Sequence, residues 1–204
     1  MRVQKKIAAV VIGGSAGSIP VLLKLLQALP AQLHIPVIIC VHRMKNMSEG
    51  IQEVFSANTQ HRVIEPEDKE PVREGCIYVA PSNYHLLIDY DYTFNLSTDR
   101  LVNFSRPSID ITLSSAARVY REELIGILLT GANKDGAEGM ACIKQNKGIT
   151  IVQDPEECAA PFMPLAAIEK SCVDFVFSQE KIAAFLAEVA GGQYSTKKLI
   201  TKRS

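Results

Sequence analysis

The feature that most constrains this fold is the stretch from Ile7 to Ser18, where an apolar run ends abruptly in a glycine-rich turn. Residues 7–12 are all apolar and mostly branched at Cβ, which predicts a strand buried on both faces. The run stops at Gly13-Gly14 and is followed by the hydroxyl of Ser15, Gly17 and the pattern of an amphipathic helix. A buried strand, a tight turn and a helix in this order indicate an α/β sheet.

The rest of the chain repeats this alternation. Apolar runs predict further buried strands, and apolar residues at helical spacing predict helices between them. The strands are expected at about 36–42, 62–65, 76–80, 124–130, 149–152 and 174–177, and the helices at about 18–29, 48–59, 108–120, 137–147, 164–170 and 178–190. Ser18, Ser108 and Ser178 are suitable N-caps.

One segment follows a different rule. From Leu86 to Leu96 every even position is apolar or aromatic and most odd positions are polar, which predicts an antiparallel ribbon with one wet face. The predicted fold class is therefore α/β, with a mostly parallel, doubly wound sheet, helices on both faces and an antiparallel hairpin insert.

Composition bounds the function classes. The chain has 204 residues, 47% of them hydrophobic and 22% charged, which predicts a single domain over 1–194 and a disordered basic tail over 195–204. Lys and Arg together equal Asp and Glu, so no nucleic-acid partner is expected. No apolar run approaches the length of a membrane span, and five scattered cysteines favour reduced thiols. We therefore expect a cytoplasmic protein without membrane insertion.

Three polar residues follow three predicted strands: Ser15, His42 and Asp135. Because carboxyl ends of parallel strands meet at one edge of a sheet, these side chains are expected to converge there. A serine hydroxyl becomes a nucleophile when a base lies within hydrogen-bond reach and an acid orients that base. The letters Gly13-x-Ser15-x-Gly17 also match the nucleophile-elbow pattern.

Each of the three residues also has a simpler interpretation. Ser15 fits a plain turn or a phosphate cradle at a helix N-terminus, His42 a core histidine, and Asp135 the N-cap of the following helix. The cradle is the weaker alternative, because His42 stands where a dinucleotide site needs an acidic residue. The four histidines show no metal-ligand spacing, so neither a metal nor a cofactor is expected.

Several ordered motifs resemble one known family. They are Val11-Ile-Gly-Gly-Ser-Ala-Gly-Ser18, Val41-His42, Tyr78-Val-Ala-Pro81 followed by His85, Arg106-Pro-Ser-Ile-Asp110, Leu128-Leu-Thr-Gly-Ala-Asn-Lys-Asp-Gly-Ala137, Val152-Gln-Asp-Pro155 and Met163-Pro164. Together they resemble the catalytic domain of the chemotaxis protein-glutamate methylesterase, CheB, from about residue 7 to residue 190.

The resemblance implies an esterase that hydrolyses γ-glutamyl methyl esters on cytoplasmic helices of methylated chemoreceptors or another methylated protein, with glutamine deamidation as a second activity. It assigns Ser15 as the nucleophile, His42 as the general base and then acid, and Asp135 as the residue that orients His42. The Ala16 N–H is a candidate oxyanion donor. Further candidate oxyanion or substrate residues are His85, Arg106 and Asp110.

The chain also departs from the chemotaxis pattern. The family's Gly-Ala-Ser-Thr-Gly-Gly is here Gly-Gly-Ser-Ala-Gly-Ser, and Lys134 precedes Asp135. The chain begins at the catalytic strand without a receiver domain, so a separate regulator protein is a candidate partner. The alternative hypothesis is a catalytically silent binding or regulatory module that keeps the same fold.

Overall fold

The computed structural model describes residues 6–42 and 50–192; the predicted tail at 195–204 lies outside the described residues. Strands and helices alternate along most of the chain, as expected. The strands are β1 (Ala9–Gly14), β2 (Val37–Val41), β3 (Arg62–Ile64), β4 (Cys76–Val79), β5 (His85–Ile88), β6 (Phe94–Ser97), β7 (Leu124–Leu128), β8 (Ile149–Gln153) and β9 (Phe175–Phe177). The helices are α1 (Ser18–Gln27), α2 (Ile51–Ser56), α3 (Ile109–Tyr120), α4 (Ala137–Gln145), α5 (Phe162–Glu169) and α6 (Gln179–Ala190), with 3₁₀ turns at Arg121–Glu123 and Pro155–Glu157.

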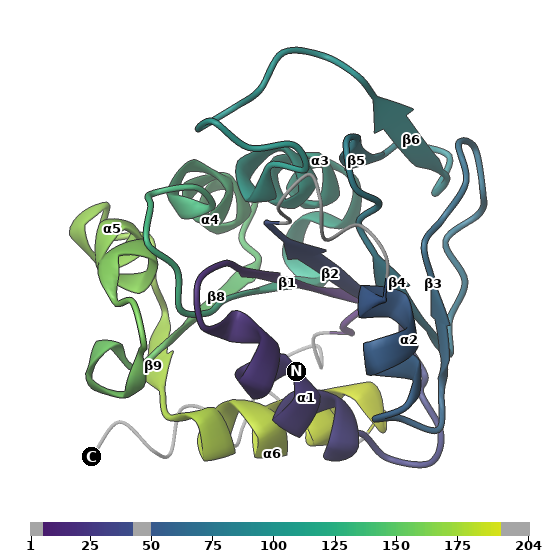
Figure 1. Ribbon diagram of the computed structural model, residues 1–204, viewed down its shortest axis with the longest axis horizontal. Helices are drawn as coiled ribbons and strands as arrows, with labels where there is room; N and C mark the ends of the chain where they lie inside the picture. The colour runs from purple at the N-terminus through teal and green to yellow at the C-terminus, as the bar shows by residue number, and fades with distance from the viewer. Residues whose placement is uncertain (1–5, 43–49, 193–204) are drawn as a thin grey trace, which may run out of the picture.

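Within the described residues, seven strands form one sheet in the order β3-β4-β2-β1-β7-β8-β9 (Figure 1). Every neighbouring pair in this sheet is parallel. β1 lies at the centre between β2 and β7. Successive strands are therefore added on one side of β1 in the first half of the chain and on its other side in the second half. That change of side creates the crevice in which α/β sheets place their sites. The predicted fold class is confirmed.

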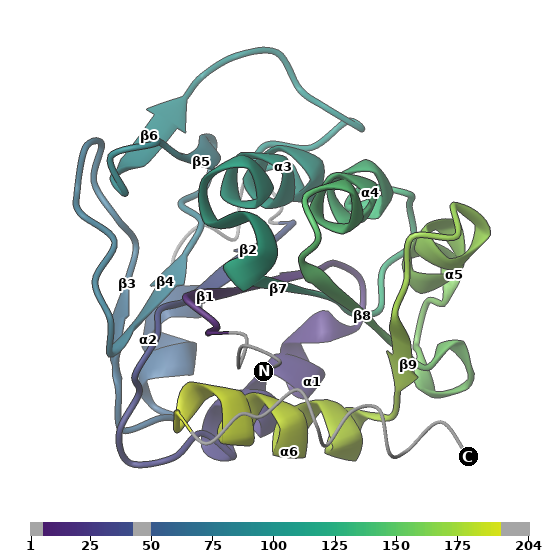
Figure 2. The same ribbon diagram turned by 180° about the vertical axis from the view of Figure 1, so that it is seen from behind.

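The sheet separates two hydrophobic layers, and the central strand contributes to both. In β1, Val10 and Ile12 pack into one core with α1 and α6, whereas Ala9 and Val11 pack into the other with α3 and α4. Figures 1 and 2 show α1, α2 and α6 on one face and α3 and α4 on the opposite face. This two-sided burial explains why the strands are continuous apolar runs rather than alternating ones.

The antiparallel insert is a two-stranded ribbon, β5 paired with β6, that lies beside α3 above the sheet (Figure 2). Its even positions Leu86, Ile88 and Phe94 are buried, as the alternation predicted. The prediction was wrong at Tyr90 and Tyr92, which are exposed because they lie at the turn. His85, just before the alternating segment, is fully buried.

Helix capping also differs in part from the prediction. Ser178 caps α6 as expected, by accepting the N–H of Lys181. α1 instead begins after Gly17, and the buried Ser18 donates its hydroxyl back to the carbonyl of Ser15 at 2.7 Å. Ser108 stands at the N-cap of α3, but its hydroxyl makes no capping bond to that helix. No helix in the described ranges is long and apolar enough to cross a membrane.

Candidate active site

The three residues singled out at strand ends meet at the carboxyl edge of the sheet. Ser15 follows β1, His42 follows β2, and Asp135 lies between β7 and α4. The Ser15 Oγ is 3.1 Å from His42 Nδ1, and His42 Nε2 is 2.7 Å from Asp135 Oδ2. Both distances are within hydrogen-bond range. The His42 ring therefore links the hydroxyl to the carboxylate through its two nitrogens, with Nδ1 facing the serine.

The Ser15 turn is held from both sides. Its N–H donates to the carbonyl of Thr130 at 3.0 Å, and its carbonyl accepts the N–H of Ser18 at 3.0 Å. Gly17 has φ +79°, and a Cβ there would lie 2.5 Å from the Cβ of Ala159. Glycine is therefore required both by the left-handed conformation and by the neighbouring loop. The turn fixes Ser15 at the start of α1.

The Thr130 hydroxyl fastens that same turn to the loop before α5. It lies 3.0 Å from the carbonyl of Ala16 and 3.1 Å from that of Ala160, and it accepts the N–H of Ala160 at 2.9 Å. The Thr130 N–H donates to the buried side chain of Gln153. Because Thr130 is itself buried, this network attaches the turn to the interior of the protein.

Asp135 is fully buried, and its carboxylate accepts hydrogen bonds from several directions. Besides the His42 ring, the donors are Asn103 Nδ2 (2.9 Å), Ser108 Oγ (2.9 Å) and the N–H groups of Ile109 (2.8 Å) and Asp110 (3.1 Å). Burial alone would raise its pKa, but bonds from His42, Asn103 and the backbone outweigh burial and lower the pKa to about 2. The carboxylate is therefore ionised at neutral pH.

Asp135 and Asp110 exchange capping roles between two helices. Asp135 precedes α4 yet accepts N–H groups from the first turn of α3. Asp110, in that first turn, accepts the N–H groups of Gly136 and Gly139 at the start of α4, both at 2.8 Å. Each carboxylate thus binds the positive end of the other helix. The alternative interpretation of Asp135 as the N-cap of the following helix is therefore wrong, since Gly136 stands at the N-cap of α4.

Asn103 is the site residue that the sequence prediction missed. Its side-chain amide donates to Asp110 Oδ2 at 2.8 Å and to Asp135 Oδ1 at 2.9 Å, so it bridges the two carboxylates. Burial and the nearby Asp135 raise the pKa of Asp110 to about 6, although the Gly139 N–H bond opposes the rise. Lys134 is exposed, and among the described residues it makes no ion pair with Asp135.

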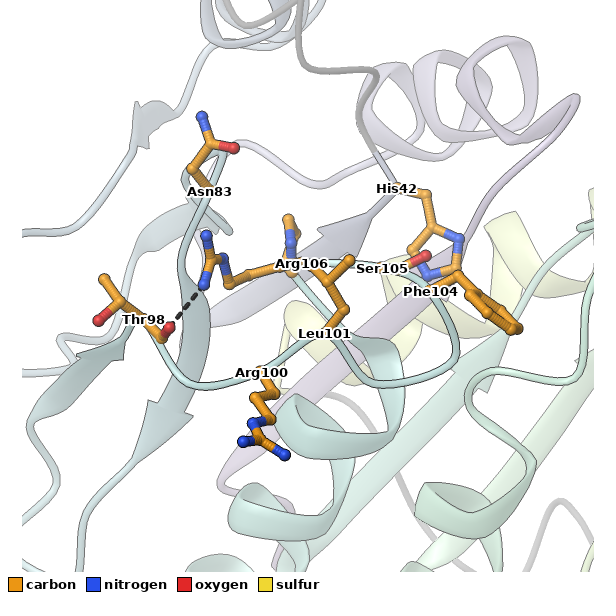
Figure 3. Close-up of a pocket in the computed structure, with 9 residues that line it drawn as sticks. His42, Asn83, Thr98, Arg100, Leu101, Phe104, Ser105 and Arg106 are labelled. Atoms are coloured by element: carbon orange, nitrogen blue, oxygen red, sulfur yellow. Dashed lines mark hydrogen bonds between the residues drawn. The ribbon is translucent and has the colours of Figure 1, made fainter.

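A pocket of about 490 Å³ opens beside His42 (Figure 3). Arg106 lines it and donates through Nη1 to the carbonyls of Thr98 (2.5 Å) and Asp99 (2.9 Å), which closes the loop at 98–106. Phe104 and Ser105 lie beside His42 in the same view. The loop is therefore one wall of the site.

The other candidate residues take different positions. His85 lies in the core, where Nε2 is 3.0 Å from the carbonyl of Arg100 and Nδ1 accepts the N–H of Ser108. Both ring nitrogens thus have protein partners, and His85 supports the loop at 98–106 through its contact with Arg100. Ala16 is exposed at the start of α1, and in the part of the chain that the structure describes its N–H donates to no protein acceptor. A free N–H beside the Ser15 hydroxyl is suited to a developing oxyanion.

Comparison with known proteins decides the family. The family model described as CheB methylesterase matches residues 10–186. The chain belongs to the CheB methylesterase family. A crystal structure of the CheB methylesterase catalytic domain of Thermotoga maritima has 31% identical sequence and a TM-score of 0.85, and the match covers 90% of this chain and 99% of that one.

Two relatives show how far the similarity to CheB proteins extends. A Leptospira interrogans protein, provisionally named as a protein-glutamate methylesterase/protein-glutamine glutaminase, is 46% identical over 175 residues, which cover 86% of this chain and 91% of the relative. The Clostridium acetobutylicum protein-glutamate methylesterase/protein-glutamine glutaminase is 31% identical over 186 residues. This chain spans only 54% of that protein's length. Family membership makes the chain a carboxylic ester hydrolase.

Proposed function

We propose that this chain hydrolyses γ-methyl esters of glutamate residues in a protein substrate, with Ser15 as nucleophile. The observation that carries the proposal is the continuous link from Ser15 Oγ through His42 to Asp135, at 3.1 and 2.7 Å. The names of the relatives support the protein-glutamate substrate and, as a second activity, glutamine deamidation. Methylated chemoreceptors are the proposed substrate class.

The geometry suggests the order of proton transfers. His42 Nδ1 takes the proton of Ser15 as its oxygen attacks the ester carbonyl, and His42 Nε2 keeps its proton toward Asp135. The ionised carboxylate stabilises the imidazolium that forms. The N–H of Ala16, at the positive end of α1, receives the oxyanion. In this chain Nδ1 faces the serine, whereas Nε2 does so in the best-known serine proteases.

The remaining steps follow from the same groups. The imidazolium of His42 gives its proton to the leaving methoxide, methanol departs, and the glutamyl chain remains bound to Ser15 as an ester. His42 then takes a proton from water as the water attacks the acyl-enzyme. The bond from the acyl carbon to Ser15 Oγ breaks, His42 returns the proton to that oxygen, and the glutamate is released. Deamidation would run through the same acyl-enzyme with ammonia as the leaving group.

The test measures methanol release from a peptide that carries one glutamate γ-methyl ester. We expect turnover by the wild-type chain and a loss on the order of 10⁴-fold or more in Ser15→Ala. A fluorophosphonate probe should label the wild-type chain at Ser15 and leave Ser15→Ala unlabelled. Absence of both turnover and labelling in a folded wild-type chain would instead favour the silent module. Equal turnover by the Ser15→Ala variant would reject Ser15 as the nucleophile.

A further inference from the structure

The tip of the loop at 98–106 has an unusual composition for its conformation. Val102 and Ser105 exchange backbone hydrogen bonds at 3.2 and 2.9 Å, so Asn103 and Phe104 form a two-residue turn. Their φ angles are +50° and +63°. Turns with both central φ angles positive favour Asn followed by Gly. Asn103 fits its position, whereas an aromatic residue at 104 adopts the left-handed region at a cost.

Packing of the Phe104 side chain does not offset this cost. Its side chain is 98% exposed, so it contributes almost no buried apolar area to folding. A single exposed apolar residue is ordinary on a protein surface, but Phe104 combines exposure, a disfavoured backbone conformation and a place in the wall of the pocket beside His42. Leu101, 53% exposed, lies in the same wall. Strain of this kind at a site is an indication of function.

The same wall carries positive charge without a matching carboxylate. Arg100 and Arg106 both line the pocket, and within residues 6–42 and 50–192 neither makes an ion pair with Asp or Glu. The positive charge of each guanidinium group therefore has no partner of opposite sign in this part of the chain. A guanidinium group beside a pocket is suited to binding a carboxylate. The wall is therefore complementary to an acidic segment with an apolar side chain.

We propose that Leu101 and Phe104 form an apolar docking subsite for the segment of the substrate protein that flanks the methylated glutamate, and that Arg100 and Arg106 bind an acidic residue of that segment. This inference rests on the proposed function. It adds which residues must flank the methylated glutamate in the substrate protein. The subsite lies in the same pocket as His42, so the flanking residues are close to the ester in sequence. Phe104 thereby acts in selection of the substrate rather than in the chemical step.

The experiment measures binding with the Ser15→Ala chain, so that its readout does not depend on turnover. The probes are two fluorescein-labelled peptides with one glutamate γ-methyl ester and flanking Glu residues. One peptide has Leu within four residues on each side of the ester, and the other has Ser at those positions. We expect the Leu peptide to bind about tenfold more tightly, because Phe104 buries an apolar side chain. Adding Phe104→Gly should remove this preference.

The matched control is Tyr90→Gly in the same Ser15→Ala background. Tyr90 is another highly exposed aromatic residue, but it lies at the turn of the ribbon and does not line the pocket. It should keep the full preference for the Leu peptide. Phe104→Gly should melt at the same temperature as its parent or higher, since glycine adopts positive φ freely. That result would exclude unfolding as the cause of weaker binding.

Two outcomes would overturn the docking subsite: equal affinity of the Ser15→Ala chain for both peptides, or an undiminished preference in the Phe104→Gly variant. Failure of the proposed function has a different signature, namely the absence of methanol release by the wild-type chain. The two ideas therefore fail separately. Replacing the flanking Glu residues of the Leu peptide by Lys should weaken its binding, and an unchanged affinity would reject the role of the two arginines.

Discussion

The two sides of the site are built in different ways. The nucleophile side, residues 13–18, is a single continuous turn that Ser18 closes and Thr130 anchors to the rest of the protein. The carboxylate side brings together Asn103, Asp110 and Asp135 from three separate segments. One side is therefore local in sequence, and the other depends on how α3 and α4 pack.

This difference predicts two kinds of sensitivity. A change on the nucleophile side should strain the backbone and displace one hydroxyl. A change on the carboxylate side should disturb chemistry and stability together, because Asp135 is hydrogen-bonded to His42 and also caps α3. Buried carboxylates that satisfy several donors are costly to replace, since every donor loses its partner at once.

The largest effect is expected for Asp135→Asn. The amide offers one acceptor oxygen where the carboxylate accepts five hydrogen bonds, and it no longer stabilises an imidazolium. We expect turnover of the methyl ester to fall on the order of 10⁴-fold, as in the worked serine triad. The free energy of unfolding should fall by about 2–4 kcal/mol. Methanol release and urea denaturation measure the two losses.

The control for this variant is Asp154→Asn. Asp154 accepts the N–H of Glu156 at the start of a 3₁₀ turn and lies outside the carboxylate cluster. Its replacement should cost no more than about 1 kcal/mol and leave turnover unchanged. If Asp135→Asn behaved like Asp154→Asn in both assays, the double role of Asp135 would be rejected.

On the nucleophile side, Gly17→Ala is expected to cost about 2–3 kcal/mol of stability. Its φ is +79°, and the new Cβ would lie 2.5 Å from the Cβ of Ala159. Gly50→Ala is the matched control, because Gly50 has φ +104° but a Cβ added there would meet no atom within 4 Å. The control isolates conformational strain, about 1 kcal/mol. Thermal denaturation should rank Gly17→Ala clearly below Gly50→Ala, and equal losses would show that the contact with Ala159 does not matter.

The sequence allowed the fold to be predicted because its signals are local and repeated. The apolar strands and their helices give the parallel sheet, and strand ends in a parallel sheet converge. For this reason Ser15, His42 and Asp135 were expected together although 93 residues separate the last two. The family motifs pointed to the same three positions.

The rest of the site could not be predicted because it depends on packing between distant segments. The cross-capping by Asp110 and Asp135 requires the first turns of α3 and α4 to meet, which no local pattern reports. Asn103 lies in a polar loop without periodicity, and its only local signal is that asparagine tolerates positive φ. His85 was a candidate oxyanion or substrate residue, but it is fully buried and its ring lies against the loop at 98–106.

Asn103→Gly tests the bridge between the two carboxylates while keeping the turn, since glycine also accepts φ +50°. Loss of the amide should raise the pKa of both Asp135 and Asp110, because Asn103 lowers both. We expect kcat/KM to fall about tenfold, the loss of one charge-assisted hydrogen bond, and the acid limb of its pH profile to move upward. Asn83→Gly is the control, with φ +64° in the same pocket. Its acid limb should stay in place, and an equal shift in both variants would reject the bridge.

The effect expected from Asp110→Asn concerns how stability depends on pH. The pKa of Asp110 is about 6 in the folded chain, against an ordinary value of 3.8. Between these values the folded chain holds a proton that the unfolded chain has lost, so the free energy of unfolding falls as pH rises from about 4 to about 6. We expect a total fall of about 3 kcal/mol from this group, since one pKa unit corresponds to about 1.4 kcal/mol. Asp135 acts in the opposite direction and at lower pH, since its pKa is lowered to about 2.

Urea denaturation of the Asp110→Asn variant measures this effect. Its free energy of unfolding should no longer fall between pH 4 and pH 6, but it should still fall below pH 4, where Asp135 becomes protonated. A slope equal to that of the wild-type chain would assign it to another group.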